Sequence, residues 1–120
     1  MLLLDTHILI HAVEGGLAPR ERRLLSEAPW SIAAISLWEI AKLAQLGRIE
    51  LDVDDAHWER LLARIQVWPL TWPVCRRLRE LDVRGDPADE LIAATALEHR
   101  VPLVTRDRIL RRSRVVPLAG

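Results

Sequence analysis

The feature that most constrains this chain is the alternation of short apolar runs with segments of helical spacing. Apolar runs at residues 1–4, 32–35 and 101–104 are each followed by a segment that starts with polar residues and continues with helical spacing. Strands that alternate with helices predict an α/β fold, with a mainly parallel sheet flanked by helices on both faces. Sheets of this kind place their ligands just beyond the carboxyl ends of the strands.

The expected elements follow from the apolar spacing, the glycines and prolines, and the capping residues. We expect strands at residues 1–4, 31–35, 67–70, 102–104 and 115–118, and helices at 6–13, 19–28, 36–46, 54–65, 72–81, 86–99 and 107–112. Residues 49–53 alternate apolar and acidic side chains, which fits an edge strand or an extended linker. The 120 residues show no internal repeat and no low-complexity segment, so we expect one domain over 1–120.

The composition excludes several classes of protein. The 17 basic and 17 acidic residues give a formal net charge of zero, so any nucleic-acid contact needs a local basic patch. Cys75 is the only cysteine, which excludes an internal disulfide and a zinc–thiolate site and predicts a buried apolar role. The first residues lack the features of a signal peptide, and no run approaches the roughly 20 apolar residues of a membrane span. We therefore expect a cytoplasmic protein.

Four acidic residues stand close to the expected helix starts: Asp5, Glu39, Asp89 and Asp107. Each one alone is well explained by capping, because Ser36 and Glu39 have capping-box spacing and Asp86 precedes a first-turn proline. Together they suggest a cation site, since two like charges about 4 Å apart repel by on the order of 1 kcal/mol in water and roughly four times that near a protein surface. An all-oxygen site selects Mg²⁺ or Mn²⁺, which suits phosphodiester hydrolysis by activated water.

Four segments carry a family resemblance: LLLDTHILIHA, AAISLWEIAKLAQLGRIELD, GDPADELIAATALEH and PLVTRDRIL. With these segments the chain resembles the PIN-domain ribonucleases, and specifically the VapC-type toxins of bacterial toxin–antitoxin systems. The resemblance covers nearly the full length, and the segments occur in the family's order.

The resemblance implies a PIN-like three-layer sandwich and a Mg²⁺- or Mn²⁺-dependent endoribonuclease that cleaves RNA. It also implies inhibition by a cognate VapB-type antitoxin, a homodimer, and a heterotetramer or larger assembly with that antitoxin. By the same resemblance Asp5, Glu39 and Asp89 are the metal-binding catalytic acids and Asp107 is a fourth, less strictly kept acid. Thr105 then contacts the metal shell or its water, and Asp86 is a supporting cap.

Three positions depart from the family pattern: His11 replaces a frequent tryptophan, Glu90 replaces a frequent basic residue, and the end VVPLAG lacks an aromatic residue. Glu90 would weaken phosphate binding or act as an outer-shell ligand. The alternative function is therefore a catalytically inactive PIN-like domain that binds RNA or protein. A different α/β phosphohydrolase or a receiver-like domain is a weaker alternative, because the only lysine, Lys42, lies within an expected helix.

Other residues carry coarser expectations. Arg106 and Arg108 flank Asp107 and are candidate RNA phosphate contacts. Trp38 and Trp58 are expected in the core or an interface. The amphipathic segment 54–66 and the apolar stretch near residues 43–46 are candidate contacts for a second copy or the antitoxin.

Overall fold

The centre of the fold is a four-stranded parallel sheet, which a computed structural model describes together with the rest of residues 1–120. The strands are β1 (Leu2–Leu4), β2 (Trp30–Ala33), β3 (Gln66–Trp68) and β4 (Leu103–Val104), in the order β3-β2-β1-β4. Leu3 of the inner strand β1 pairs with Ser31 on one side and with Leu103 on the other. The carboxyl ends of four strands therefore lie along one edge, as the alternating pattern predicts.

The expected strand at 115–118 is wrong. Only an isolated bridge joins Leu118 to Leu103. Pro117 explains this, because its ring nitrogen has no hydrogen to donate and a longer ladder cannot form there. Residues 49–53 form no strand and serve as a linker between helices.

Helices occupy most of the remaining chain. Their bounds are α1 (Thr6–Glu14), α2 (Pro19–Leu25), α3 (Ala34–Gln45), α4 (Ala56–Arg64), α5 (Trp72–Arg76) and α6 (Pro87–His99), with 3-10 turns η1 (Arg77–Glu80) and η2 (Leu110–Arg112). The predicted helix at 72–81 is thus split into α5 and η1. None of these helices combines the length and apolar character that crossing a membrane requires.

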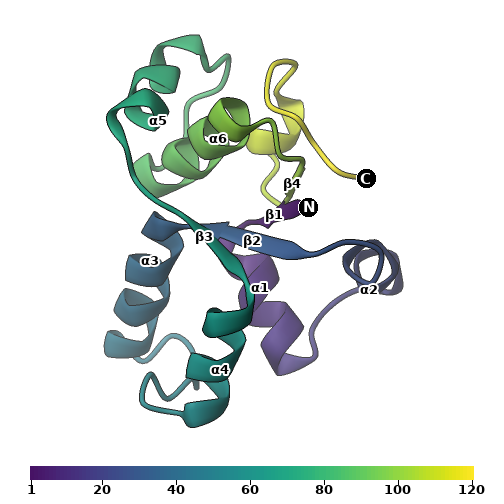
Figure 1. Cartoon of the computed structure of the whole chain (residues 1–120), viewed down its shortest axis with the longest axis vertical. Coiled ribbons are helices and arrows are strands. Elements are labelled where there is room, and N and C mark those ends of the chain that lie inside the picture. Colours follow the sequence, from purple (N-terminus) through teal and green to yellow (C-terminus); the bar gives the residue numbers. More distant parts are fainter.

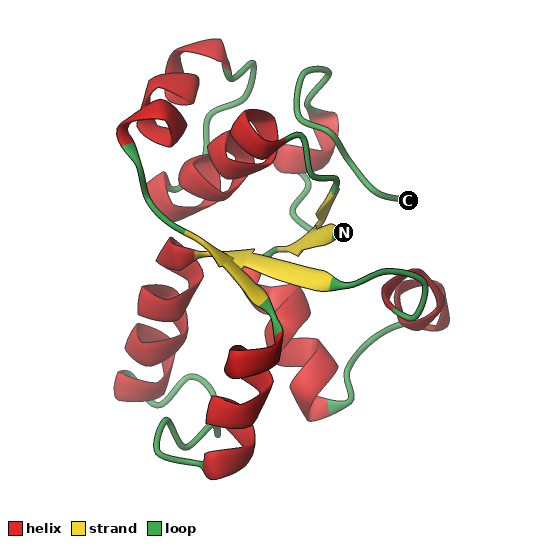
Figure 2. Cartoon of the chain, viewed as in Figure 1, coloured by secondary structure: helices red, strands yellow, loops and turns green.

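The helices form a layer on each face of the sheet (Figure 1; Figure 2). Helices α1, α3 and α4 lie on one face, and α5, α6 and the C-terminal segment lie on the other. Alternate residues of β1 supply the two cores: Leu2 and Leu4 join the α1 side, and Leu3 joins the α6 side. This three-layer α/β architecture confirms the predicted fold class.

Small residues allow α6 to approach the sheet closely. Ala93, Ala94 and Ala96 are all fully buried, and Ala93 belongs to the same apolar cluster as Leu3 and Ala33. There is no room in this layer for longer side chains, because protein interiors are close-packed. The start of α6, which carries Asp89, is therefore held near the sheet.

The tryptophans and the cysteine divide between core and surface. Trp58 is buried in the α1-side core, as expected, whereas Trp38 is 58% exposed and lies outside both cores. Cys75 is half-buried rather than fully buried.

We predict that Ala93→Leu lowers the free energy of unfolding by about 1–3 kcal/mol, because added methylenes in a packed core force side chains and backbone to shift. Denaturant unfolding measures this change. Ala63→Leu is the matched control, since Ala63 is an exposed alanine of helix α4. Equal stability of the two variants would contradict close packing of α6 against the sheet.

Candidate active site

Asp5 lies at the point where the inner strand β1 enters helix α1. Its Oδ1 accepts a hydrogen bond from the Thr6 backbone N–H at 2.7 Å, so it caps the helix. Its Oδ2 accepts a hydrogen bond from the Thr105 hydroxyl at 2.6 Å. The side chain is buried, and loss of hydration raises the pKa of Asp5 despite these two hydrogen bonds. Capping and a further function are therefore compatible at this residue.

Glu39 does not form the predicted capping box with Ser36. Helix α3 begins at Ala34, two residues earlier than expected, which places Ser36 inside the helix and away from the N-cap position. The Glu39 carboxylate points away from its own backbone and accepts a hydrogen bond from the Thr6 hydroxyl at 2.5 Å. Burial is the main cause that raises the pKa of Glu39, and the nearby charge of Asp5 adds to it.

Thr6 joins these elements, and the sequence analysis missed it. Its hydroxyl oxygen also lies 2.8 Å from the Ser36 hydroxyl oxygen. Because one hydroxyl carries a single hydrogen, the Ser36 hydroxyl donates to Thr6 while Thr6 donates to Glu39. The available signal was its spacing: Thr6 shares a helix face with Leu9 and Ile10, where a polar side chain must find a partner.

Asp89, in the first turn of α6, has the most perturbed acid–base behaviour of the group. Burial is the largest of the causes that together raise the pKa of Asp89 to about 7, and the charges of Asp5, Asp107, Glu39 and Asp86 follow in that order. The four predicted acids come from the end of β1, from α3, from α6 and from the segment after β4. The fold therefore brings the four predicted acids into one electrostatic cluster.

Asp107 caps the turn that follows it, in agreement with the capping role that its position alone predicts. Its Oδ1 accepts hydrogen bonds from the backbone N–H groups of Ile109 and Leu110, both at 2.9 Å. The Thr105 hydroxyl oxygen accepts from the Asp107 backbone N–H at 3.0 Å while donating to Asp5. Thr105 thus links the first and fourth acids.

The other predicted site residues differ in the contacts that they make. Asp86 occupies the N-cap position of α6, as predicted, but its side chain makes no capping hydrogen bond. Glu90 turns back to accept a hydrogen bond from the Gly85 N–H at 3.0 Å. Arg106 forms an ion pair with Glu21 at 2.6 Å, and this guanidinium holds the pKa of Glu21 at about 2. Arg108 is exposed.

The chemistry of the donor set fits a hard divalent cation. All candidate ligands are carboxylate or hydroxyl oxygens, which suit Mg²⁺ or Mn²⁺. No arginine or lysine forms an ion pair with these carboxylates, although the charge of His7 lowers the pKa of Asp5 and of Glu39. In this conformation, however, no group of three or more histidine, cysteine or acidic side chains lies close enough together to hold a metal ion.

Comparisons with known proteins agree with this architecture. Residues 2–115 match the PIN domain family. Ribonuclease VapC22 of Mycobacterium tuberculosis is 41% identical over 87 residues, which span 70% of this chain and 67% of that protein.

Solved structures at lower identity show the same fold. A toxin–antitoxin complex from Klebsiella pneumoniae has a TM-score of 0.75 at 20% identity, over 99% of this chain and 97% of that chain. DNA-bound VapBC from Salmonella typhimurium has a TM-score of 0.72 at 22% identity, over 99% and 98% of the two chains. The family match, the identity to a VapC ribonuclease and the shared fold lead to one conclusion: this chain belongs to the PIN-domain family, and within it to the VapC type.

Proposed function

We propose that this protein is a Mg²⁺- or Mn²⁺-dependent endoribonuclease that acts as a toxin. The observation that carries the proposal is the cluster of four carboxylates at the strand ends, in which Asp89 has a pKa of about 7. Carboxylates that have no arginine or lysine partner, at the carboxyl edge of an α/β sheet, suit a divalent ion and a phosphodiester substrate. The identity to a protein named as a ribonuclease supports the choice of RNA.

In this proposal Asp5, Glu39 and Asp89 hold the metal, and Asp107 completes the acidic group. A bound divalent ion would lower the pKa of a water molecule and offset charge that develops on the phosphodiester. The protein's own contribution is orientation: the Thr105 hydroxyl holds Asp5, and the Thr6 hydroxyl holds Glu39. Buried partners of this kind keep the carboxylates in one geometry.

Asp86, Arg106 and Arg108 have outer roles in the proposal. Asp86 would contact a water molecule in the outer shell of a bound ion. Arg108 is free to contact a phosphate, whereas Arg106 must first leave Glu21 to do so. We infer that residues 1–120 act as one PIN-like domain in the cytoplasm. A VapB-type antitoxin would inhibit it, as a homodimer or within a heterotetramer or larger assembly.

A catalytically inactive PIN-like domain that binds RNA or protein is the second candidate. The observation that favours it is the lack of three acidic side chains at metal-binding spacing in this conformation. The position of Glu90 gives it no support, because that carboxylate is bound to the backbone of Gly85. A measurement of metal binding distinguishes the metal-dependent ribonuclease from the inactive binding domain.

We predict that Asp5→Asn abolishes RNA cleavage, with a loss of on the order of 100-fold or more, because several kcal/mol of transition-state stabilisation depend on a metal held by this residue. Cleavage of a labelled RNA with Mg²⁺ or Mn²⁺ measures the effect. Asp54→Asn is the control, since Asp54 is exposed and lies outside the cluster. Wild-type cleavage by Asp5→Asn would refute the assignment.

Thr6→Val should lower the cleavage rate by about 10- to 100-fold, the usual cost of losing a side chain that orients a metal ligand. Valine has nearly the same shape as threonine but cannot donate to Glu39. Thr6→Ser restores the hydroxyl and should recover most of the rate. Equal rates for the valine and serine variants would show that this hydrogen bond has no part in cleavage.

The pH dependence of stability tests Asp89. The pKa of Asp89 is raised in the folded state, so its ionisation opposes folding, and stability is lost as the pH rises from 3.8 through about 7. Without metal, Asp89→Asn should therefore raise the melting temperature above about pH 7 by a few degrees. We expect Asp89→Asn to raise the free energy of unfolding by about 1 kcal/mol. The effect is this small because Asp89 is only half-buried and solvent screens its charge.

The same thermal measurement tests metal binding. Millimolar Mg²⁺ or Mn²⁺ should raise the melting temperature of the wild type and have little effect on Asp89→Asn, because an ion that binds only the folded state stabilises it. Asp54→Asn should respond as the wild type does. Absence of any metal effect on the wild type would favour the inactive binding domain.

A further inference from the structure

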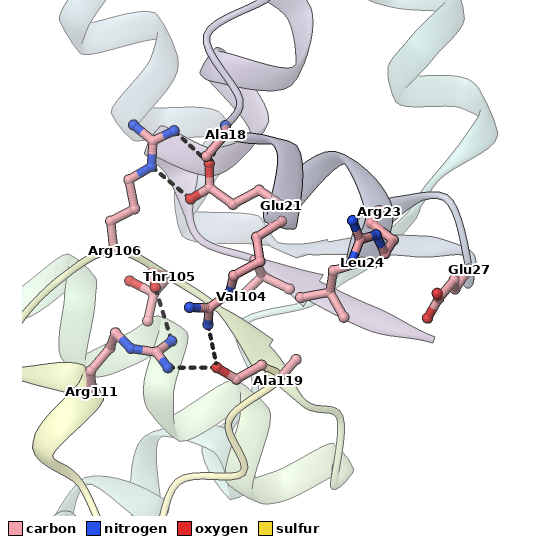
Figure 3. Close-up of a pocket in the computed structure, with 12 residues that line it drawn as sticks. Ala18, Glu21, Arg23, Leu24, Glu27, Val104, Thr105, Arg106, Arg111 and Ala119 are labelled. Carbon is pink, nitrogen blue, oxygen red and sulfur yellow. Dashed lines mark hydrogen bonds and ion pairs between the residues drawn. The ribbon is translucent and has the colours of Figure 1, made fainter.

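A cavity of about 520 Å³ lies between helix α2 and the chain that follows β4 (Figure 3). Its charged lining consists of Arg20, Arg23, Arg106, Arg111, Glu21 and Glu27. The lining thus has two more basic than acidic side chains, whereas basic and acidic side chains are equal in number over the whole chain. We call this cavity the arginine cleft.

Two of the arginines converge on a single oxygen atom. The guanidinium groups of Arg20 and Arg111 both donate to the Gly120 oxygen, at 3.0 and 2.9 Å. Arg111 also donates to the Thr105 carbonyl oxygen at 3.3 Å. Each guanidinium has five N–H donors, so these contacts engage only a minority of them. Most of their hydrogen-bonding capacity is therefore still available to an anion.

The other two arginines differ in their availability. Arg106 is neutralised by Glu21 through contacts of 2.6 and 2.7 Å, which close one end of the cleft (Figure 3). Arg23 makes no ion pair. The cations free to bind a ligand are thus Arg20, Arg23 and Arg111, and planar guanidinium forks match phosphate oxygens.

The cleft adjoins the carboxylate cluster. Thr105 lines the cleft, and its hydroxyl donates to Asp5 on the other side at 2.6 Å. A basic site and an acidic site thus share one residue as their common wall. A free phosphate would need only the basic site, whereas a strand of linked phosphates contacts both.

We propose that the arginine cleft binds a backbone phosphate of the RNA strand, adjacent to the phosphodiester that meets the carboxylates. This inference rests on the proposed function and adds a second contact that holds the strand in place. The contact is independent of base identity, because it recognises phosphate alone. It explains how a chain of zero net charge holds a polyanion beside four acidic residues.

RNA affinity and its salt dependence test the proposal. The Asp5→Asn protein is used because it should not cleave the RNA during the measurement. Fluorescence anisotropy with a labelled single-stranded RNA reports the affinity at several salt concentrations. In this background the double variant Arg20→Gln/Arg111→Gln should bind about 10-fold more weakly, with a salt slope smaller by about 0.7 for each lost phosphate contact. Arg111→Lys, which keeps the charge, should retain most of the affinity.

Two further variants guard against a structural artefact. Arg23→Gln removes no ion pair and should still weaken binding, even if the double variant loosens the C-terminal segment. Arg64→Gln is the matched control, because Arg64 is an exposed arginine of α4 outside the cleft, and it should bind as the parent does.

The outcomes separate this inference from the proposed function. Cleavage by the wild type together with unchanged RNA affinity and salt slope in Arg23→Gln and the double variant would overturn the cleft alone. A wild type that neither binds nor cleaves RNA would overturn both. Thermal stabilisation by inorganic phosphate, lost in the double variant while RNA affinity is unchanged, would assign the cleft to a free anion and overturn the RNA contact.

Discussion

Burial of neighbouring carboxylates at one edge of the sheet is the constraint on which this site depends. The strands are only two to four residues long, and β1 is an inner strand. Asp5 follows it directly, so its carboxylate enters a region with little water. Burial raises the pKa of Asp5, Glu39 and Asp89. The hydroxyls of Thr6 and Thr105 oppose that rise, and each holds one carboxylate in place.

Positively and negatively charged side chains lie near each other around Thr105 but form two separate groups. The carboxylates lie on one side of Thr105, and the arginine cleft lies on the other. Direct contact between these groups would form salt bridges, in which the arginines and the carboxylates neutralise each other. The ion pair between Arg106 and Glu21 neutralises one arginine of the cleft and involves none of the four acids. Separation of the charges would leave each proposed site able to bind a ligand.

Local sequence patterns predicted the regular part of this fold well. The apolar run of β1 and the alanines of α6 identify a central strand and a closely packed helix, because both depend on burial alone. One error occurred where a distant residue decides the local structure, and another where Pro117 within the segment limits pairing with the sheet. Ser36 has the spacing of a cap, yet Thr6 holds its hydroxyl inside α3. Residues 115–118 have the apolar character of a strand, yet only Leu118 reaches the sheet.

The candidate site was predictable in its membership and not in its geometry. The resemblance identified Asp5, Glu39, Asp89 and Asp107, and the structure couples their charges. The arginine cleft was not predictable, because Arg20 and Arg111 meet only through tertiary folding. Thr6 was missed because a threonine at the start of a helix commonly interacts only with its own helix.

The hydrogen bond between Thr105 and Asp5 joins residues that are 100 positions apart. During synthesis Thr105 leaves the ribosome 100 residues after Asp5. The loop between them can close only after the whole intervening segment has been translated. β4, Thr105 and Asp107 therefore reach Asp5 only after helices α1 to α6 have all been made. Translation of Asp5 is thus separated in time from the moment at which the cluster can first form.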